Sequence, residues 1–104
     1  MKKTLPWLLL FALLISVNCL ADSAESAALF KSKCAMCHGP DGTASTTMGK
    51  NLGIKSYKAP EVQKQPDADI KNIIVNGKGK MPSYKTLTTE QVDGLVKYIR
   101  ELGK

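Results

Sequence analysis

Residues 34–38, C-A-M-C-H, hold two cysteines and the chain's only histidine. Two thiols three positions apart on a helical turn are spaced to add to the two vinyl groups of a porphyrin, which gives two thioether bonds. The histidine that follows directly then lies beneath the ring, and neutral imidazole is a good iron ligand. The segment therefore predicts one covalently bound haem c, attached through Cys34 and Cys37, with His38 as an axial iron ligand.

Other uses of a C-x-x-C pair fit the chain less well. A structural zinc site needs four ligands, whereas the chain after residue 21 offers two cysteines and one histidine. A thioredoxin-like redox pair belongs in a βαβ context, which the sequence pattern does not show. A plain disulfide would leave the position of His38 unexplained.

The candidates for the second axial position are methionines, because the chain has no second histidine. Met36 lies inside the attachment segment and cannot reach the opposite face of a haem, whereas Met48 and Met81 can. The stretch G-K-G-K-M-P favours Met81, since glycines let the backbone approach a flat ligand and Pro82 stiffens the segment. Core packing, the usual role of methionine, is the alternative for both residues.

Three helices are predicted to position these residues, and no stretch alternates for long enough to be a strand. Residues 23–33 carry apolar side chains at helical spacing, after an Asp22–Glu25 pair that could form a capping box. Residues 66–76 begin with a proline, a favoured first-turn residue, and end before a glycine. Residues 88–102 begin with a Thr88–Gln91 capping pair and carry a long apolar stripe.

A long connection separates the first two helices. It runs from Gly39 to Gln65 and contains a shorter turn from Ser56 to Lys64. A connection of this length usually belongs to a site. The predicted fold is therefore all-α, with three main helices and ordered loops wrapped round one haem.

Residues 1–21 are a different kind of sequence. A basic M-K-K start, an apolar stretch over residues 5–20 and a small residue at Ala21 form the pattern of a secretory signal peptide. The apolar stretch is short for a membrane span of about 20 residues, but an uncleaved anchor stays open as an alternative. We expect export to the periplasm or an equivalent compartment, and one domain over residues 22–104.

The composition limits the size of the core and the kind of partner. A chain of 104 residues with 43% hydrophobic residues folds as one small domain, in which a large apolar cofactor would supplement the core. The formal net charge is +6, basic and acidic residues are interleaved, and only 6% of the residues are aromatic. This pattern in an exported chain argues against binding of nucleic acid and favours an acidic protein surface as the partner.

Residues 25–102 resemble the small class I cytochromes c of the bacterial monohaem type. The resemblance rests on Phe30 before the first cysteine, on C-x-x-C-H-G-P-D-G and G-x-G-x-M-P, and on a closing helix with Leu95 and Tyr98. It implies that the first and last helices cross, and that Phe30 meets Leu95 and Tyr98 at the crossing.

The chain departs from the family pattern at two places. Ser26 replaces a glycine that is usual at the helix crossing, so a slightly looser contact is expected there. Residues 49–52, G-K-N-L, replace a common G-P-N-L segment whose proline carbonyl accepts the hydrogen bond of the ligating histidine. The acceptor for the second ring nitrogen of His38 therefore stays open.

The predicted function is electron transfer and not catalysis. With His38 and Met81 both bound, a haem iron has no open position for oxygen, peroxide or a substrate, and it changes oxidation state with little change in geometry. Lys78, Lys80 and Lys85 flank Met81, and the long connection adds Lys50, Lys55 and Lys58. If these lysines surround the exposed haem edge, they would steer redox proteins with acidic docking surfaces. Membrane contact is expected only through partner complexes or an uncleaved N-terminal segment.

Three alternatives come from other classes of protein. A peroxidase or an oxygen-binding protein would need Met81 to be absent from the iron or weakly bound. A gas-binding four-helix cytochrome places C-x-x-C-H near its C-terminus, whereas here the motif lies near the start of the domain. A dedicated subunit of a larger oxidoreductase can share every motif with a diffusing carrier.

Overall fold

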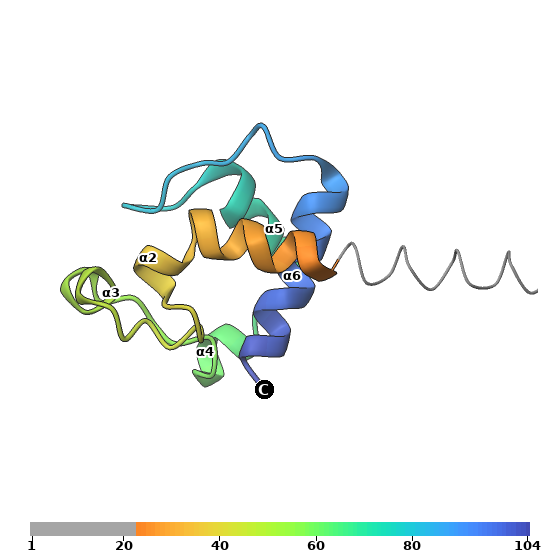
Figure 1. Ribbon diagram of the computed structural model, residues 1–104. Coiled ribbons are helices and arrows are strands. Elements are labelled where there is room, and N and C mark those ends of the chain that lie inside the picture. Colours follow the sequence, from red (N-terminus) through yellow and green to blue (C-terminus); the bar gives the residue numbers. More distant parts are fainter. Residues whose placement is uncertain (1–22) are drawn as a thin grey trace, which may run out of the picture.

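The computed structural model describes residues 23–104, which form helices and loops (Figure 1). Helical residues 23–33 are followed by α2 (Ala35–His38), α3 (Thr47–Leu52), α4 (Pro60–Gln63), α5 (Asp67–Asn76) and α6 (Thr89–Leu102). The only β pairing within this part of the chain is an isolated antiparallel bridge between Lys78 and Met81. The all-α prediction is confirmed. Between residues 23 and 104, no helix has the length and apolar character needed to cross a membrane.

The predicted start signals of the two later helices are present with one adjustment. The Thr88 hydroxyl accepts from the Gln91 backbone N–H at 3.1 Å, and the Gln91 side-chain carbonyl accepts from the Thr88 N–H at 2.9 Å. This reciprocal capping box opens α6 as predicted. Pro66 is the N-cap of α5 and not a first-turn residue. Asp22, and with it the capping pair expected before residue 23, lies outside the described residues, as does the expected signal peptide.

The connection over residues 39–65 is not all loop, because it contains α3 and α4. α4 occupies part of the short turn that was expected there and begins at Pro60, a favoured first-turn position. α3 was missed by the sequence pattern. Helices of four to six residues make too few turns to show an apolar stripe, so their periodicity gives no signal.

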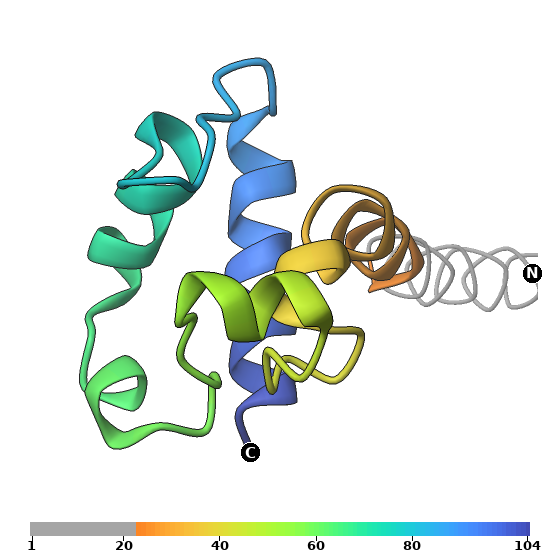
Figure 2. The same cartoon turned by 90° about the vertical axis from the view of Figure 1, so that its left-hand side faces the viewer.

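Helical residues 23–33 cross α6 at close range, and both ribbon views show the two segments lying across each other (Figures 1 and 2). Ser26 is only 7% exposed at this crossing. A Cβ atom added to Gly94 of α6 would collide with the Ser26 hydroxyl oxygen. The looser contact expected from Ser26 is therefore not observed, because α6 itself supplies the glycine that lets the helices approach.

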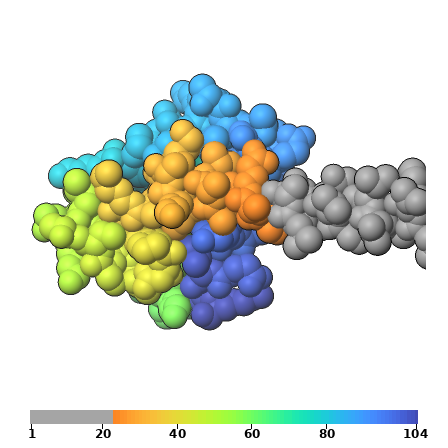
Figure 3. Space-filling model, in the orientation of Figure 1, coloured from red at the N-terminus to blue at the C-terminus, as the bar shows by residue number. Residues whose placement is uncertain are grey.

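The core lies around this crossing. Phe30 and Leu95 are the most deeply buried large side chains among the described residues, each 1% exposed. The Phe30 ring lies 5.1 Å from the Tyr98 ring between centroids, and the predicted cluster of Phe30, Leu95 and Tyr98 is confirmed. In the space-filling view, the orange segment 23–33 runs across the molecule in contact with the blue C-terminal part of the chain (Figure 3).

Arg100 fastens α6 to the junction between α4 and α5. Its guanidinium lies 3.0 Å from Asp67 Oδ1 in an ion pair and donates to the Val62 carbonyl at 3.2 Å. It also donates to the Gln65 carbonyl. One half-buried side chain therefore bonds to three residues of this junction and holds α5 beside α6. The buried apolar residues of both helices belong to the same core cluster.

We predict that Gly94→Ala destabilises the protein by about 2 kcal/mol, because the new methyl group overpacks against buried Ser26. In a Ser26→Gly background the same change should be neutral or stabilising by up to about 1 kcal/mol, since alanine is the better helix former. Denaturant unfolding of the four members of this mutant cycle measures both effects. Equal effects of Gly94→Ala in the two backgrounds would show that Ser26 is not the obstacle.

Candidate haem site

The C-A-M-C-H segment forms α2, with Cys34 as its N-cap. The Cys34 N–H donates to the Phe30 carbonyl at 2.9 Å, so this turn continues directly from helical residues 23–33. The His38 N–H donates to the Cys34 carbonyl at 3.0 Å. Both sulfur atoms belong to half-buried residues and are not joined in a disulfide. The structure thus brings Cys34, Cys37 and His38 together on one turn, held by the helix that crosses α6.

A cleft opens beside this turn. Its largest part has a volume of about 610 Å³ and is lined by Cys34, Cys37, His38 and Met81, within the range of cofactor sites in proteins. Two smaller cavities, of about 190 and 20 Å³, share His38 and Met81 with it. The branched aliphatic residues of these walls are Leu52, Ile54, Val62, Ile70, Ile73, Ile74, Leu87, Leu95 and Ile99. Apolar walls with two thiols and an imidazole on one turn fit a covalently attached haem.

Met81 lies in a tight turn across the cleft from α2. The Met81 N–H donates to the Lys78 carbonyl at 2.9 Å, and the Lys78 N–H donates to the Met81 carbonyl at 3.1 Å. Gly77 has a positive φ of 76°, and a Cβ atom at this position would lie 2.7 Å from the Met81 carbonyl oxygen. Glycine is therefore required at position 77 for the turn to close on itself.

Tyr84 ties the Met81 turn to the opposite wall. Its hydroxyl donates to the Lys33 carbonyl at 2.9 Å, one residue before Cys34. Its backbone N–H donates to the Ile74 carbonyl at 3.0 Å. Tyr84 was not singled out by the sequence, because a tyrosine three residues after a methionine has no pattern of its own.

The other two methionines of the described residues lie away from the cleft. Met48 is on α3 and 43% exposed, and Met36 is 76% exposed. Neither lines any of the three cavities that His38 lines. Of the methionines considered from the sequence, the structure brings only Met81 to the same cleft as His38.

The His38 ring is half-buried and stacked on another aromatic ring. Its centroid lies 5.0 Å from that of Tyr57, with 23° between the planes. Burial lowers the pKa of the His38 imidazole, which favours the neutral form that binds iron. Burial also raises the pKa of the Cys34 thiol from 9.0 to about 11, against the opposing charge of Lys33. Tyr57 is a further residue that sequence reasoning missed.

Within residues 23–104, the structure shows no acceptor for the second ring nitrogen of His38. His38 Nδ1 is buried and has no hydrogen-bond partner there. The Lys50 carbonyl accepts instead from the Gly53 N–H at 3.2 Å, and the Lys50 N–H donates to the Thr46 carbonyl at 3.0 Å. A proline could not make the second bond. Lysine at position 50 thus allows α3 to form a regular turn.

α3 in turn holds the end of α2. The Thr46 hydroxyl donates to the Cys37 carbonyl at 3.2 Å, and the Ala44 N–H donates to the His38 carbonyl at 2.7 Å. A Cβ atom on Gly49 would lie 2.5 Å from the carbonyl oxygens of both Cys37 and Ala44. The two short helices therefore pack with no room for a side chain at position 49.

Four lysines line the large cavity, and no carboxylate does so. They are Lys33, Lys55, Lys78 and Lys80. Lys78 and Lys80 were expected from their positions beside Met81, and Lys55 from its place in the loop region, whereas Lys33 was not expected. Lys85 is exposed but does not line this cavity. Lys55 forms an ion pair with Glu61 at 3.9 Å, so the unpaired positive charge of this lining comes from Lys33, Lys78 and Lys80.

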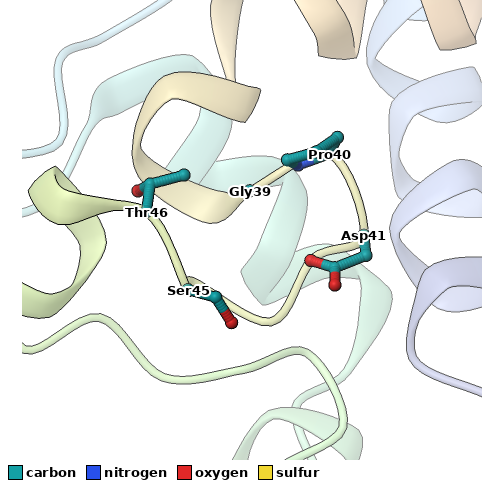
Figure 4. A pocket seen from close by; sticks show the side chains of 5 residues that line it. All are labelled: Gly39, Pro40, Asp41, Ser45 and Thr46. Carbon is teal, nitrogen blue, oxygen red and sulfur yellow. The ribbon is translucent and has the colours of Figure 1, made fainter.

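A separate hollow of about 450 Å³ lies in the loop between α2 and α3, lined by Gly39, Pro40, Asp41, Ser45 and Thr46 (Figure 4). Asp41 Oδ1 accepts from the Thr43 N–H at 3.1 Å and from its hydroxyl at 2.7 Å. These bonds stabilise the loop itself, and no residue of the thiol–imidazole turn from 34 to 38 lines the hollow.

A helical fold with a C-x-x-C-H turn on an apolar cleft is that of a small class I monohaem c-type cytochrome. The family model of cytochrome c oxidase, cbb3-type, subunit III matches residues 21–99. Over 90 residues, cytochrome c6 of Anabaena variabilis is 33% identical, covering 81% of this chain and 93% of the relative. Cytochrome c6 of Nostoc sp. is 34% identical over 90 residues, with 81% and 72% covered.

A solved structure, the KustC0563 c-type cytochrome, is 32% identical with a TM-score of 0.68, covering 76% of this chain and 98% of that one. The chain therefore belongs to the cbb3-type subunit III family of c-type cytochromes. It binds haem c covalently and is an electron carrier, not an enzyme.

We predict that Gly49→Ala destabilises the holoprotein by about 2 kcal/mol, because backbone carbonyls on both sides of the new methyl group must move. Met48→Ala, on an exposed side chain of the same helix, is the matched control and should change stability by less than about 0.5 kcal/mol. Denaturant unfolding followed by haem absorbance measures both. Equal stability of the two variants would contradict close packing of α3 on α2.

Proposed function

We propose that the chain carries single electrons between exported redox proteins through an iron with His38 and Met81 as axial ligands. In this proposal, Cys34 and Cys37 form the two thioether bonds to the haem. The main support for the proposal is that His38 and Met81 line all three cavities of the cleft. When bound, haem c supplies an iron that alternates between the ferric and ferrous states and so takes up or releases one electron.

The protein's own side chains suit the cleft to this role. A neutral imidazole and an uncharged thioether add no net charge, and isoleucines are the most frequent residues in the lining of one cavity. A low-polarity surrounding disfavours extra positive charge on the site, which favours the reduced state. With both protein ligands bound, no position is left for an external ligand, and this separates the proposal from a peroxidase or an oxygen-binding protein.

The proposal includes export of residues 22–104 after removal of residues 1–21. It is supported by the basic, apolar and small-residue regions of the N-terminal sequence. The mass of the exported holoprotein distinguishes the alternatives, since a chain that begins at Asp22 has been cleaved whereas one that begins at Met1 has kept an anchor.

The proposal also includes docking of acidic partners at the cleft. Four lysines line its largest part, and three of them, Lys33, Lys78 and Lys80, form no ion pair within residues 23–104. Charges of one sign at the mouth of a cleft steer partners of opposite sign and raise the association rate at low ionic strength.

A fixed subunit of a larger oxidoreductase is a second candidate, because the matching family model is described as an oxidase subunit. Native electrophoresis of solubilised cells, stained for haem, separates the two. Migration at the mass of the single chain favours a diffusing carrier, and co-migration with a terminal oxidase favours the subunit.

Met81→Ala should abolish the near-infrared charge-transfer band of a ferric iron–methionine bond and open the iron to carbon monoxide. Met48→Ala, on a side chain outside the cleft, should retain the band. Absorption spectra of the oxidised and reduced holoproteins test both. A band that survives Met81→Ala, or that disappears in Met48→Ala, would exclude Met81 as the ligand.

Reversing three cleft lysines, Lys33, Lys78 and Lys80, to glutamate should slow oxidation by anionic hexacyanoferrate about tenfold at low ionic strength. Oxidation by cationic tris(phenanthroline)cobalt(III) should become faster. Reversing Lys31, Lys64 and Lys97, exposed lysines that do not line the cleft, is the charge-matched control. Stopped-flow rates at low and high salt give the comparison. Equal rates for both triple variants would remove the docking role.

A further inference from the structure

Two observations at His38 belong together. Its Nδ1 atom is buried without a hydrogen-bond partner among the described residues, although buried polar groups are nearly always paired. Its ring is stacked on Tyr57 with 23° between the planes. A ligating histidine is usually oriented by the hydrogen bond of its second nitrogen. Here the aromatic stack is the contact in the structure that defines the plane of the ring.

Tyr57 is held in place by two backbone hydrogen bonds and by a ring contact. Its N–H donates to the Gly42 carbonyl at 2.9 Å, and its carbonyl accepts from the Gln63 side-chain amide at 2.6 Å. Its ring also meets Phe30 edge-on, with 6.1 Å between centroids. The loop after α2, the short helix α4 and the core thus fix Tyr57 from three directions.

Glycine is required where the chain passes closest to the Tyr57 ring. Gly42 has a φ of 75°, and a Cβ atom there would lie 2.6 Å from the ring carbon Cδ2. The loop from α2 therefore closes directly over the ring. Tyr57 is also only slightly exposed, and burial raises the pKa of its hydroxyl, so the ring stays neutral beside His38.

We propose that Tyr57 is the positioning residue of His38, and that stacking on its ring sets the orientation of the imidazole plane in place of a hydrogen bond from Nδ1. The inference rests on His38 as an axial ligand, the proposed function. A neutral aromatic face packs against the imidazole without competing for either nitrogen. Because Tyr57 is anchored by its backbone and by Phe30, the imidazole plane is fixed to the core of the fold.

The first test uses the wild-type reduced holoprotein, which is diamagnetic, and proton NMR. Nuclear Overhauser contacts are expected between the ring protons of Tyr57 and those of His38. Absence of these contacts would overturn the inference whatever the variants show. The same spectrum tests the proposed function, because the ring protons of an axial histidine are shifted strongly upfield by the porphyrin. Unshifted His38 protons would reject the ligand assignment, not the stacking.

The second test compares Tyr57→Phe, which keeps the ring, with Tyr57→Leu, which removes it. In the ferric state, the order and spread of the haem methyl resonances report the orientations of the axial ligands, that of the imidazole plane included. We expect Tyr57→Phe to retain the wild-type pattern and Tyr57→Leu to change it. Tyr98→Leu is the control, since Tyr98 contacts Phe30 and loses an aromatic ring from the same core.

The outcomes separate positioning from general stability. A methyl pattern changed by Tyr57→Leu and unchanged by Tyr98→Leu supports the inference. The same pattern in all three variants, or equal changes in Tyr57→Leu and Tyr98→Leu, overturns it. If Tyr57→Leu does not fold, the wild-type contacts together with an unchanged pattern in Tyr57→Phe support the inference, and a changed pattern in Tyr57→Phe overturns it.

Discussion

The close crossing of helical residues 23–33 and α6 at Gly94 is the contact on which the rest of the structure depends. The thiol-bearing turn continues from this segment through the bond between the Cys34 N–H and the Phe30 carbonyl. The position of the crossing therefore sets the position of α2. α6 also contributes Leu95 and Ile99 to the cleft and holds the α4–α5 junction through Arg100. A shift at the crossing would move both walls of the cleft together.

The surroundings of α2 show how a four-residue helix is held in place. Such a helix cannot satisfy its own terminal carbonyls, and here they are met by Thr46 and Ala44 from the loop before α3. α3 can hold its regular turn because Lys50 has an N–H to donate. His38 Nδ1 is a buried side-chain atom of α2 for which the described residues provide no hydrogen-bond partner. Hydrogen bonding thus fixes the backbone of α2, while the His38 imidazole ring is in contact with the Tyr57 ring.

The parts of the molecule that could be predicted from sequence are those with long periodicity or with a chemical motif. α6 has a capping box and a stripe of four buried residues, and C-x-x-C-H has few competing explanations. α3 could not be predicted, because it depends on the contact of Gly49 with α2 and not on its own pattern. Tyr57 lies close in space to His38 but 19 positions away in sequence, so no spacing rule could pair them. The looser contact predicted from Ser26 was wrong, because the glycine that allows the close approach, Gly94, lies on α6.

The two sides of the cleft are held unequally. His38 lies on a helical turn and is stacked on an anchored ring, whereas Met81 lies on a four-residue turn whose backbone is closed by the Lys78–Met81 bridge. The Tyr84 hydroxyl adds one hydrogen bond across to Lys33, of a kind that contributes about 1 kcal/mol. Local opening occurs where hydrogen bonds and buried contacts are fewest, so we expect the Met81 turn to open before α2 does. Under the proposed ligation, an intact Met81 turn gives an electron carrier and an open one gives a site for external ligands. The difference between these two chemistries then lies in the stability of residues 77–84 and not in the haem attachment segment.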